Sequence, residues 1–153
     1  MSSDKVQFLL RDAEDSDYNF ITSSWLKSYR SSAFAEGCPN DLYYAHLGAM
    51  IAHWRKTASL KVLCDPTDGN NLFGFICYDT DPMYGEGLGL LHFVYVKYTF
   101  RGFGLASKVL ENVMQDNNIH TWFTSHNTTQ LRGLSAKFPM HYSPFLIALG
   151  LMK

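Results

Sequence analysis

The sequence predicts a single α/β (α+β) domain that spans residues 1–153. Short runs of β-branched and aromatic residues, typical of strands, alternate along the chain with stretches whose apolar residues recur at helical spacing. The length is ordinary for one domain and is sufficient to bury a sizeable core. No internal repeat, linker or low-complexity tract divides the sequence, so we expect one folding unit.

The first half of the chain is predicted to form a strand, two helices and a hairpin. Apolar residues on one face and capping residues before each start indicate the helices. A run of aspartate, proline, glycine and asparagine between two apolar runs indicates the hairpin. In order, the predicted elements are a strand over 6–10, a helix that begins at 15 or 16 and carries 18–29, a loop over 31–40, a helix from 40 or 41 to about 56, and hairpin strands over 60–64 and 72–78 joined by a turn over 65–71.

The second half is predicted to add a long central strand, a helix and shorter elements. The run Leu88–Val96 is apolar and ends in β-branched and aromatic residues, as a buried strand should. Apolar residues then recur at helical spacing, at Ala106, Val109, Leu110, Val113 and Met114. The other predicted elements are a loop over 79–87, a strand over 121–124, a short helix over 128–138 and a last strand over 143–149.

Small residues join the central strand to its helix. Gly102 and Gly104 stand where the helix begins and keep side chains away from its first turn. The first N–H groups of a helix have no partner within it, and the helix dipole is positive there, so this start favours a phosphate or pyrophosphate. Glycines needed for packing alone are the alternative. Neither the Gly-Lys-Ser/Thr of a P-loop nor the spacing of a dinucleotide fingerprint is present.

The order Arg-x-x-Gly-x-Ala on Arg101, Gly104 and Ala106, after a strand that ends in Val96, resembles the acyl-CoA signature of the GNAT N-acetyltransferase superfamily. The order of predicted elements is similar to that fold over nearly the whole chain, and the similarity thins at the carboxyl end. The resemblance implies a mixed, mostly antiparallel central sheet with splayed strands, flanked by about four helices. The stretches over 23–30 and 95–104 also resemble small GNAT-like proteins encoded by tailed bacteriophages, which indicates no substrate.

The resemblance implies acetyl-CoA as the acyl donor and no metal. The residues implied to hold its pyrophosphate are Arg101, Gly102, Phe103, Gly104, Leu105 and Ala106. The pantetheine arm would pair, like an added strand, with the backbone of Phe93, Val94, Tyr95 and Val96, in a wedge beside the strand that begins near Thr121. Asn127 matches the family's asparagine that touches this arm. A neutral amine would attack the thioester directly, helped by proximity and by an N–H near Tyr95 or Val96 that polarises the carbonyl.

Proton transfer requires a base for the amine and an acid for the leaving thiolate. Glu86, just before the central strand, is the first candidate base, and a solvated loop carboxylate is the alternative. His92, within the strand, is the second candidate, although a structural histidine is the more common case. The family's acid is a tyrosine seven residues beyond the asparagine, where this chain has Leu134. Tyr142 is the favoured replacement, with Ser135, water or direct thiolate release as alternatives and core packing as the other role for Tyr142.

The resemblance implies that the first two helices, their connection and the carboxyl end select the acceptor, a primary amine of a protein lysine or of a small molecule. Tyr29 and Glu36 are the predicted pocket residues there, whereas Trp25 is expected to pack in the core. A second hypothesis is a catalytically degenerate fold that acts by binding a partner protein. Leu134 and the short carboxyl end favour this second hypothesis, whereas the intact loop over 101–106 and Asn127 favour the enzyme. A homodimer is a further expectation.

Composition and charge limit the cellular location and the classes of partner that we expect for the protein. With 13 Lys and Arg against 14 Asp and Glu, the formal net charge of -1 provides no field for nucleic acid or anionic membranes. No apolar run is long enough for a membrane span and no signal-peptide core begins the chain, which predicts a cytoplasmic protein, in the host cytoplasm if it is phage-encoded. Cys38, Cys64 and Cys77 are odd in number and lack metal-ligand spacing, so we expect reduced thiols in or near the core.

Overall fold

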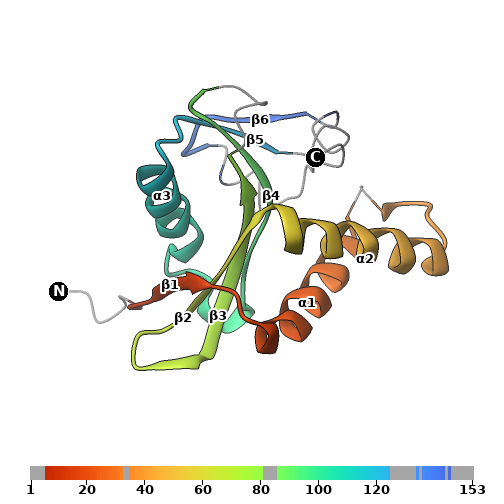
Figure 1. Cartoon of the computed structure of the whole chain (residues 1–153), viewed down its shortest axis with the longest axis horizontal. Coiled ribbons are helices and arrows are strands. Elements are labelled where there is room, and N and C mark those ends of the chain that lie inside the picture. The colour runs from red at the N-terminus through yellow and green to blue at the C-terminus, as the bar shows by residue number, and fades with distance from the viewer. Residues whose placement is uncertain are drawn as a thin grey trace.

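The structure, a computed structural model, describes residues 6–32, 35–80, 86–124, 134, 136–143 and 145. Within these residues six strands form one sheet in the order β1-β2-β3-β4-β5-β6 (Figure 1). The strands are β1 Leu9–Asp12, β2 Ser59–Asp65, β3 Asp68–Asp79, β4 Leu88–Val96, β5 Thr121–Thr124 and β6 Met140–Tyr142. Pairing is antiparallel from β1 to β4 and parallel from β4 to β6. The predicted mixed, mostly antiparallel sheet is therefore confirmed.

Helices cover both faces of this sheet (Figure 1). The described α-helices are α1 Tyr18–Arg30, α2 Asn40–Thr57 and α3 Leu105–Asn117. Helices α1 and α2 share one hydrophobic core with one face of the sheet, and α3 shares a second core with the other face. Because both faces are covered, β3 and β4 are apolar along most of their length instead of alternating with polar residues. The fourth predicted helix, over 128–138, lies mostly outside the described residues.

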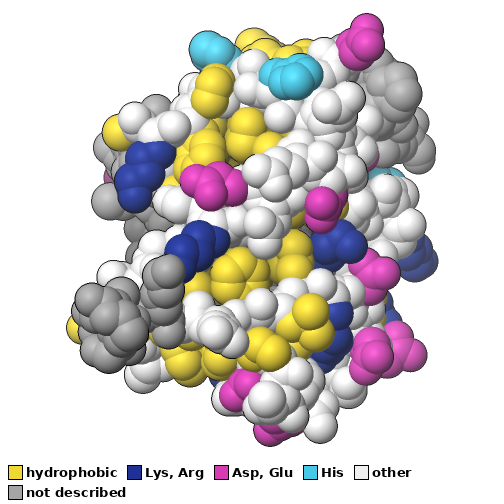
Figure 2. All heavy atoms as spheres, turned by 90° about the vertical axis from the view of Figure 1, so that its left-hand side faces the viewer, with side chains coloured by type: hydrophobic (Ala, Val, Ile, Leu, Met, Phe, Trp, Pro, Cys, Tyr) yellow, Lys and Arg dark blue, Asp and Glu magenta, His cyan; other side chains and the backbone are white. Residues whose placement is uncertain are grey.

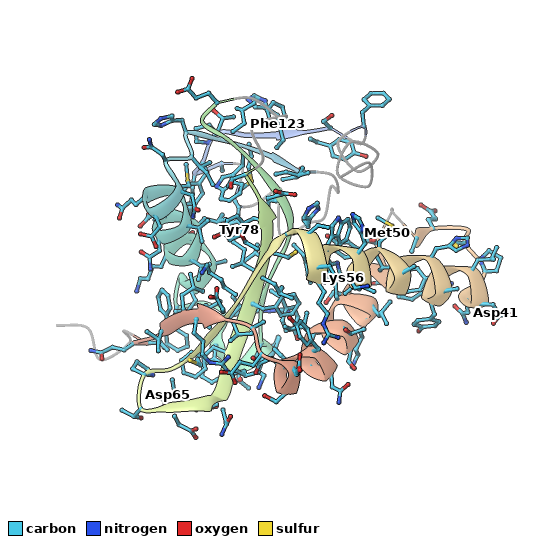
Figure 3. The ribbon with its side chains drawn as sticks, viewed as in Figure 1. Asp41, Met50, Lys56, Asp65, Tyr78 and Phe123 are labelled. Carbon is cyan, nitrogen blue, oxygen red and sulfur yellow. The ribbon has the colours of Figure 1, made fainter. Side chains whose placement is uncertain are left out.

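Side chains at helical spacing attach each helix to its face of the sheet. The buried ones are Ile21, Trp25 and Tyr29 of α1, Tyr43, Leu47, Ile51 and Trp54 of α2, and Leu105, Val109, Leu110 and Val113 of α3. On the α3 side, Tyr78 of β3 points toward the helix (Figure 3), and the Asn117 amide donates a 3.2 Å hydrogen bond to its hydroxyl. This spacing is the sequence signal that predicted the three helices.

Two predicted strand boundaries at the amino-terminal half are wrong. The first strand is Leu9–Asp12 instead of 6–10, because Arg11 and Asp12 pair with β2, where the Lys61 ammonium lies 2.8 Å from the Asp12 carboxylate. The second hairpin strand begins at Asp68 instead of 72, because pairing continues to Asp65 and Asp68 at the tip of the hairpin. Polar residues that are typical of turns thus extend a strand when a neighbouring strand pairs with them.

The carboxyl end also differs from its prediction. The last described strand, β6, is Met140–Tyr142 and not 143–149, and Ser143 follows it with its N–H donating 2.8 Å to the Thr124 carbonyl. Residues 144 and 146–149 of the predicted strand lie outside the described residues. The parallel pairing of β6 with β5 sets this boundary, since Met140, His141 and Tyr142 align with Trp122, Phe123 and Thr124.

A partly buried ion pair fixes the start of α1 against β1. The Asp17 carboxylate accepts hydrogen bonds from the Arg11 guanidinium at 2.8 and 3.1 Å and from the Glu14 N–H at 2.8 Å. Hydrogen bonding from Arg11 lowers the pKa of Asp17 below its ordinary value. A carboxylate with a lowered pKa stabilises the fold at pH values above its ordinary pKa, and this contribution is lost as the pH falls through the lowered value.

We expect Asp17→Asn to lower the free energy of unfolding at pH 7 by about 1–3 kcal/mol, because Arg11 loses its charged acceptor in a buried position. The variant should also lose stability less steeply than the native protein below about pH 4. Urea unfolding at pH 7 and at pH 3 measures both effects. Asp15→Asn is the matched control, because Asp15 is exposed and pairs only at 3.2 Å with Arg55. Equal losses in the two variants would contradict the prediction.

Surface and thiol features agree with the composition. In the part of the chain that is described, no helix is long and apolar enough to cross a membrane. On the side of the molecule shown in Figure 2, basic side chains stand apart from one another with acidic and apolar ones between them. Cys64 and Cys77 are buried and Cys38 is half-buried, so the three cysteines lie in or near the core, as predicted.

Candidate functional site

The connection between β4 and α3 forms a cavity of about 500 Å³. The chain leaves β4 at Val96, makes one turn of 3-10 helix over Tyr98–Phe100, and enters α3 through Gly102 and Gly104. The residues that line the cavity are Val96, Phe100, Arg101, Gly102, Gly104, Leu105, Ala106 and Ser107. All but Val96, Phe100 and Ser107 were predicted as pyrophosphate-binding residues, so the structure brings most of that set into one cavity.

The two glycines are required by backbone conformation. Gly102 and Gly104 have φ angles of 93° and 73°, a left-handed conformation that other residues rarely adopt. A Cβ at either position would have no atom within 4 Å, so crowding does not explain the glycines. The structure therefore contradicts the alternative that these glycines are needed for packing alone. They allow the left-handed backbone conformation and leave open space beside the turn.

Helix α3 begins without a side-chain cap. Gly104 is its N-cap residue and makes no side-chain hydrogen bond, while its carbonyl accepts the first helical bond, from the Lys108 N–H at 3.1 Å. The N–H groups of the first turn have no partners within a helix, and the helix dipole concentrates positive potential there. Donors of this kind at the wall of a cavity are suited to phosphate oxygens.

Arg101 attaches this turn to the end of β4. Its Nε donates a 2.7 Å hydrogen bond to the Val96 carbonyl. Its guanidinium carbon lies 5.6 Å from the ring centre of Tyr95 and 6.0 Å from that of Tyr98. The side chain is exposed at the cavity, so it adds a permanent positive charge beside the amides of the helix start.

The edge of β4 near this cavity is not paired over the residues described. The ladder with β5 runs from Leu88 opposite Thr121 to Leu91 opposite Thr124. Phe93–Val96, predicted to pair with the pantetheine arm, follow the last described pair and lead directly into the cavity. Asn127 lies outside the described residues, so the structure does not place it.

The structure does not place the two candidate bases at the cavity. The His92 side chain is fully buried, with its ring stacked 4.2 Å from that of Trp54 on the α2 side of the sheet. Glu86 is exposed at the other end of β4, where it lines a separate cavity of about 700 Å³ with Asn117, Asn118 and His120 among its neighbours. Glu86 precedes β4, and the nine residues of β4 extend over about 26 Å from Leu88 to Val96, so the strand separates Glu86 from the cavity. Glu86 was predicted as a base because it lies just before β4 in the sequence, but the length of β4 places it far from the cavity.

Tyr142 lies two strands away from the point where the unpaired part of β4 begins. Thr124 aligns with Leu91 on one side and with Tyr142 on the other. Two strand spacings amount to about 10 Å, so Tyr142 lies at the level where the described β4–β5 ladder ends. Its side chain is 54% exposed, which contradicts the alternative of core packing. Leu134, which stands where the resemblance implies a tyrosine, is buried in the core beneath α3.

Of the two residues predicted to line the pocket for the acceptor substrate, one is buried and the other is exposed. Tyr29 has no exposed surface and its hydroxyl donates a 2.5 Å hydrogen bond to the His92 carbonyl, so it does not line a pocket as predicted. Its helical position gave no sign of this long-range contact. Glu36 is exposed in the α1–α2 connection and lines a cavity of about 540 Å³ with Arg30 and Gly37 among its neighbours. Trp25 packs in the core, as predicted.

Gly74 lies beside the end of β4 that lines the cavity, and it was not among the site residues predicted from the sequence. It aligns with Val96 across the β3–β4 ladder, and a Cβ there would lie 2.0 Å from the Tyr95 carbonyl oxygen. A side chain at this position would therefore collide with the backbone of β4 where that strand reaches the cavity. A lone glycine inside an apolar strand was the available signal, since such a glycine often marks a close backbone approach.

Among the described residues, no group of three or more His, Cys, Asp or Glu side chains is arranged to hold a metal ion. The site consists instead of backbone donors, one guanidinium and an unpaired strand edge. Such an arrangement can bind an extended ligand that carries a phosphate group at one end.

Comparisons with known proteins agree with this geometry. Residues 19–131 match the model of the Acetyltransferase (GNAT) family. No curated protein matches the sequence. A structure from Bacillus subtilis, classed as an acetyltransferase, has a TM-score of 0.65 at 11% identity and covers 85% of this chain and 87% of its own.

Two further solved structures have the same fold. A Corynebacterium glutamicum protein, described as histone acetyltransferase HPA2 and related acetyltransferase, has a TM-score of 0.63 at 16% identity, covering 86% of this chain and 83% of its own. A GNAT family acetyltransferase from Brucella melitensis, solved in complex with acetyl-CoA, has a TM-score of 0.53 at 15% identity, covering 84% and 81%. The family match spans most of the chain and includes the β4–α3 turn, and the chain therefore belongs to the GNAT acetyltransferase family.

Proposed function

We propose that the protein is an N-acetyltransferase that moves an acetyl group from acetyl-CoA to a primary amine. The observation that carries this proposal is the cavity at the start of α3, where two left-handed glycines and an uncapped helix end direct backbone donors into open space. These donors match the phosphate oxygens of a CoA ester. Family membership supports the reaction class, and the acceptor is inferred from the chemistry of amine attack on a thioester.

The residues present fit a CoA ester along its length. Amides from Arg101 to Ala106, with Phe103 and Leu105 among them, would hold the pyrophosphate, and the Arg101 charge would favour it further. The backbone of Phe93–Val96 would hold the arm, and Asn127 is proposed to contact it. Acetyl-CoA, when bound, supplies an acetyl group activated as a thioester.

The chain contributes mainly by orientation. A strand edge holds an extended ligand in one register, which brings the reacting atoms together and removes much of the entropic cost of their encounter. An N–H at the Phe93 end of this segment, and not one near Tyr95 or Val96 as predicted, is proposed to donate to the thioester carbonyl oxygen as charge develops on it, because Val96 borders the phosphate cavity. Preorganised backbone donors need no reorientation during the reaction, and the Arg101 bond to the Val96 carbonyl keeps the cavity end of the strand fixed.

Proton transfer is proposed to involve Tyr142 and water. Tyr142 is exposed near the level where the described β4–β5 ladder ends, so its hydroxyl is the candidate donor to the leaving thiolate. We assign removal of the amine proton to water, because the His92 ring is fully buried and Glu86 lies at the other end of β4.

A second candidate is a family member that binds a partner protein without turnover. The absence of both candidate bases from the cavity favours it, together with the buried Leu134 at the position of the usual acid. The acceptor of the first candidate is proposed to be a protein lysine or a small molecule that enters beside Glu36. A homodimer, a cytoplasmic location and a phage origin remain parts of the proposal.

Titration calorimetry with acetyl-CoA, followed by thiol release in the presence of an amine panel and of lysine-containing peptides, tests the proposal. We expect binding, together with a rate that rises with pH because more of the acceptor amine is neutral. Glu86→Gln is the control, and its pH profile should match the native one. No heat of binding would overturn both the enzyme and the CoA site. Binding with thiol release that no amine accelerates would favour the second candidate.

A further inference from the structure

β4 contains a bulge at His92. Cys77 of β3 aligns with Phe93, but the next residue, Tyr78, aligns with Leu91. Two steps along β4 therefore correspond to one step along β3, and His92 is the extra residue. A bulge interrupts the regular pairing of the two strands at this point and increases their local twist.

The side chains around the bulge confirm that their regular alternation between the two faces of the sheet is interrupted at His92. The rings of His92 and Phe93, which are consecutive, both face the helices α1 and α2, where they stack on Trp54 at 4.2 Å and on Trp25 at 5.4 Å. Leu91 and Val94, on either side of them, both belong to the core beneath α3. Peptide groups before and after His92 are therefore oriented differently from those of a regular strand.

Tyr29 of α1 provides a partner for the bulge. Its hydroxyl donates a 2.5 Å hydrogen bond to the His92 carbonyl, in a position with no exposed surface. The Tyr29 ring is held edge-on by Phe93 at 4.8 Å and by Trp25 at 6.1 Å, so the hydroxyl has little freedom to turn away. Burial raises the pKa of Tyr29 well above its ordinary value, which keeps the hydroxyl protonated and able to donate.

The bulge directly precedes the strand edge that the proposed function assigns to the arm of acetyl-CoA. Phe93, the first residue of that edge, follows His92 in the sequence and also contacts the Tyr29 ring. The other end of the edge, Val96, is fixed by Arg101. Side chains from outside the sheet therefore hold both ends of the same four-residue segment, one at the phosphate end and one at the end where the thioester would lie.

We propose that Tyr29 is a positioning residue for acetyl transfer, because its hydrogen bond to the His92 carbonyl fixes the β4 bulge and with it the backbone donors that orient the thioester. Tyr29 itself does not touch either substrate. This inference rests on the proposed function. A loosened bulge would let the thioester end move while the pyrophosphate stays bound, so the chemical step should suffer more than the affinity for acetyl-CoA.

Tyr29→Phe removes one oxygen and keeps the ring that packs against Phe93. We expect amide hydrogen exchange over 91–94, measured without ligand, to become about tenfold faster, because the His92 carbonyl loses its hydrogen bond from the Tyr29 hydroxyl. We expect kcat to fall by about tenfold while KM for acetyl-CoA changes by less than about twofold. Thermal unfolding verifies that the variant is folded.

Tyr43→Phe is the matched control. Tyr43 is also buried and its hydroxyl also donates to a backbone carbonyl, that of Leu26, but this bond joins α2 to α1 without touching β4. The control should leave exchange over 91–94 and kcat unchanged. Faster exchange in Tyr29→Phe with native kcat would overturn the role in transfer. Equal behaviour of the two variants would overturn the tether as well.

The two proposals fail in different ways. If the native protein does not bind acetyl-CoA, the proposed function is wrong and the role of Tyr29 in transfer is wrong with it. If the native protein transfers acetyl groups and Tyr29→Phe does so equally well, only the inference about Tyr29 is wrong. The exchange measurement needs no ligand and therefore tests the effect of Tyr29 on the bulge in either case.

Discussion

Gly74→Ala is expected to cause a large loss of stability. The new Cβ would lie 2.0 Å from the Tyr95 carbonyl oxygen and 3.0 Å from the Val96 Cα, both backbone atoms that no rotamer change can move. One of the two central strands must therefore shift, and overpacking of this kind costs about 1–3 kcal/mol and occasionally more. Since whole domains have only about 5–15 kcal/mol of net stability, urea unfolding should detect the change easily.

The same substitution should also weaken acetyl-CoA binding, because Val96 lines the cavity and aligns with Gly74 across the ladder. Gly48→Ala is the matched control. Gly48 lies within α2, and its Cβ would meet no atom within 4 Å. Alanine there should stabilise the protein by up to about 1 kcal/mol, since it favours helix more than glycine does. Similar stabilities for the two variants would show that β3 and β4 can separate without cost.

Gly104→Val is expected to raise the dissociation constant for acetyl-CoA by at least about tenfold, a change of about 1.4 kcal/mol or more. Gly104 has a φ of 73°, which a β-branched residue adopts only with strain. Relief of that strain would turn the first N–H groups of α3 away from the cavity, and the valine methyl groups would occupy part of it. Titration calorimetry measures the loss directly.

Gly37→Val is the control that distinguishes a loss of acetyl-CoA binding at the helix start from the loss of stability caused by a strained backbone. Gly37 has a φ of 77°, and a Cβ there would also meet no atom within 4 Å, but it lies in the α1–α2 connection. Both variants should lose a comparable amount of stability, about 1–2 kcal/mol. Only Gly104→Val should lose affinity for acetyl-CoA. If both variants bind acetyl-CoA as the native protein does, the helix start is not its phosphate site.

Local sequence signals were sufficient for the order of the elements from β1 to β5 and for the glycine turn before α3. The apolar run into Val96, the glycines at 102 and 104 and the helical spacing that follows are all set by neighbouring residues, and the structure assembles them into one cavity. Boundaries were less predictable where pairing with another strand decided them, as at Arg11 and Asp68. Strand propensity is a property of one segment, whereas the residues at which a strand begins and ends also depend on pairing with the neighbouring strand.

The predicted catalytic and acceptor residues illustrate what local signals omit. Tyr29 and His92 are separated by 63 positions, so their hydrogen bond has no local signature. Both were interpreted by residue type, as a pocket aromatic and a titratable strand residue, and the fold places both in the core instead. Glu86 was interpreted by its sequence distance to β4, but an extended strand moves its two ends far apart.

The uncapped start of α3 has a consequence for the stability of the whole molecule. A side-chain cap commonly contributes about 1 kcal/mol to a helix, and α3 begins at Gly104 without one. A bound anion accepting from the same N–H groups would serve as the missing cap. The helix would then be completed by the ligand and not by the chain, so the concentration of acetyl-CoA in the cell would help to set how much of the protein is folded.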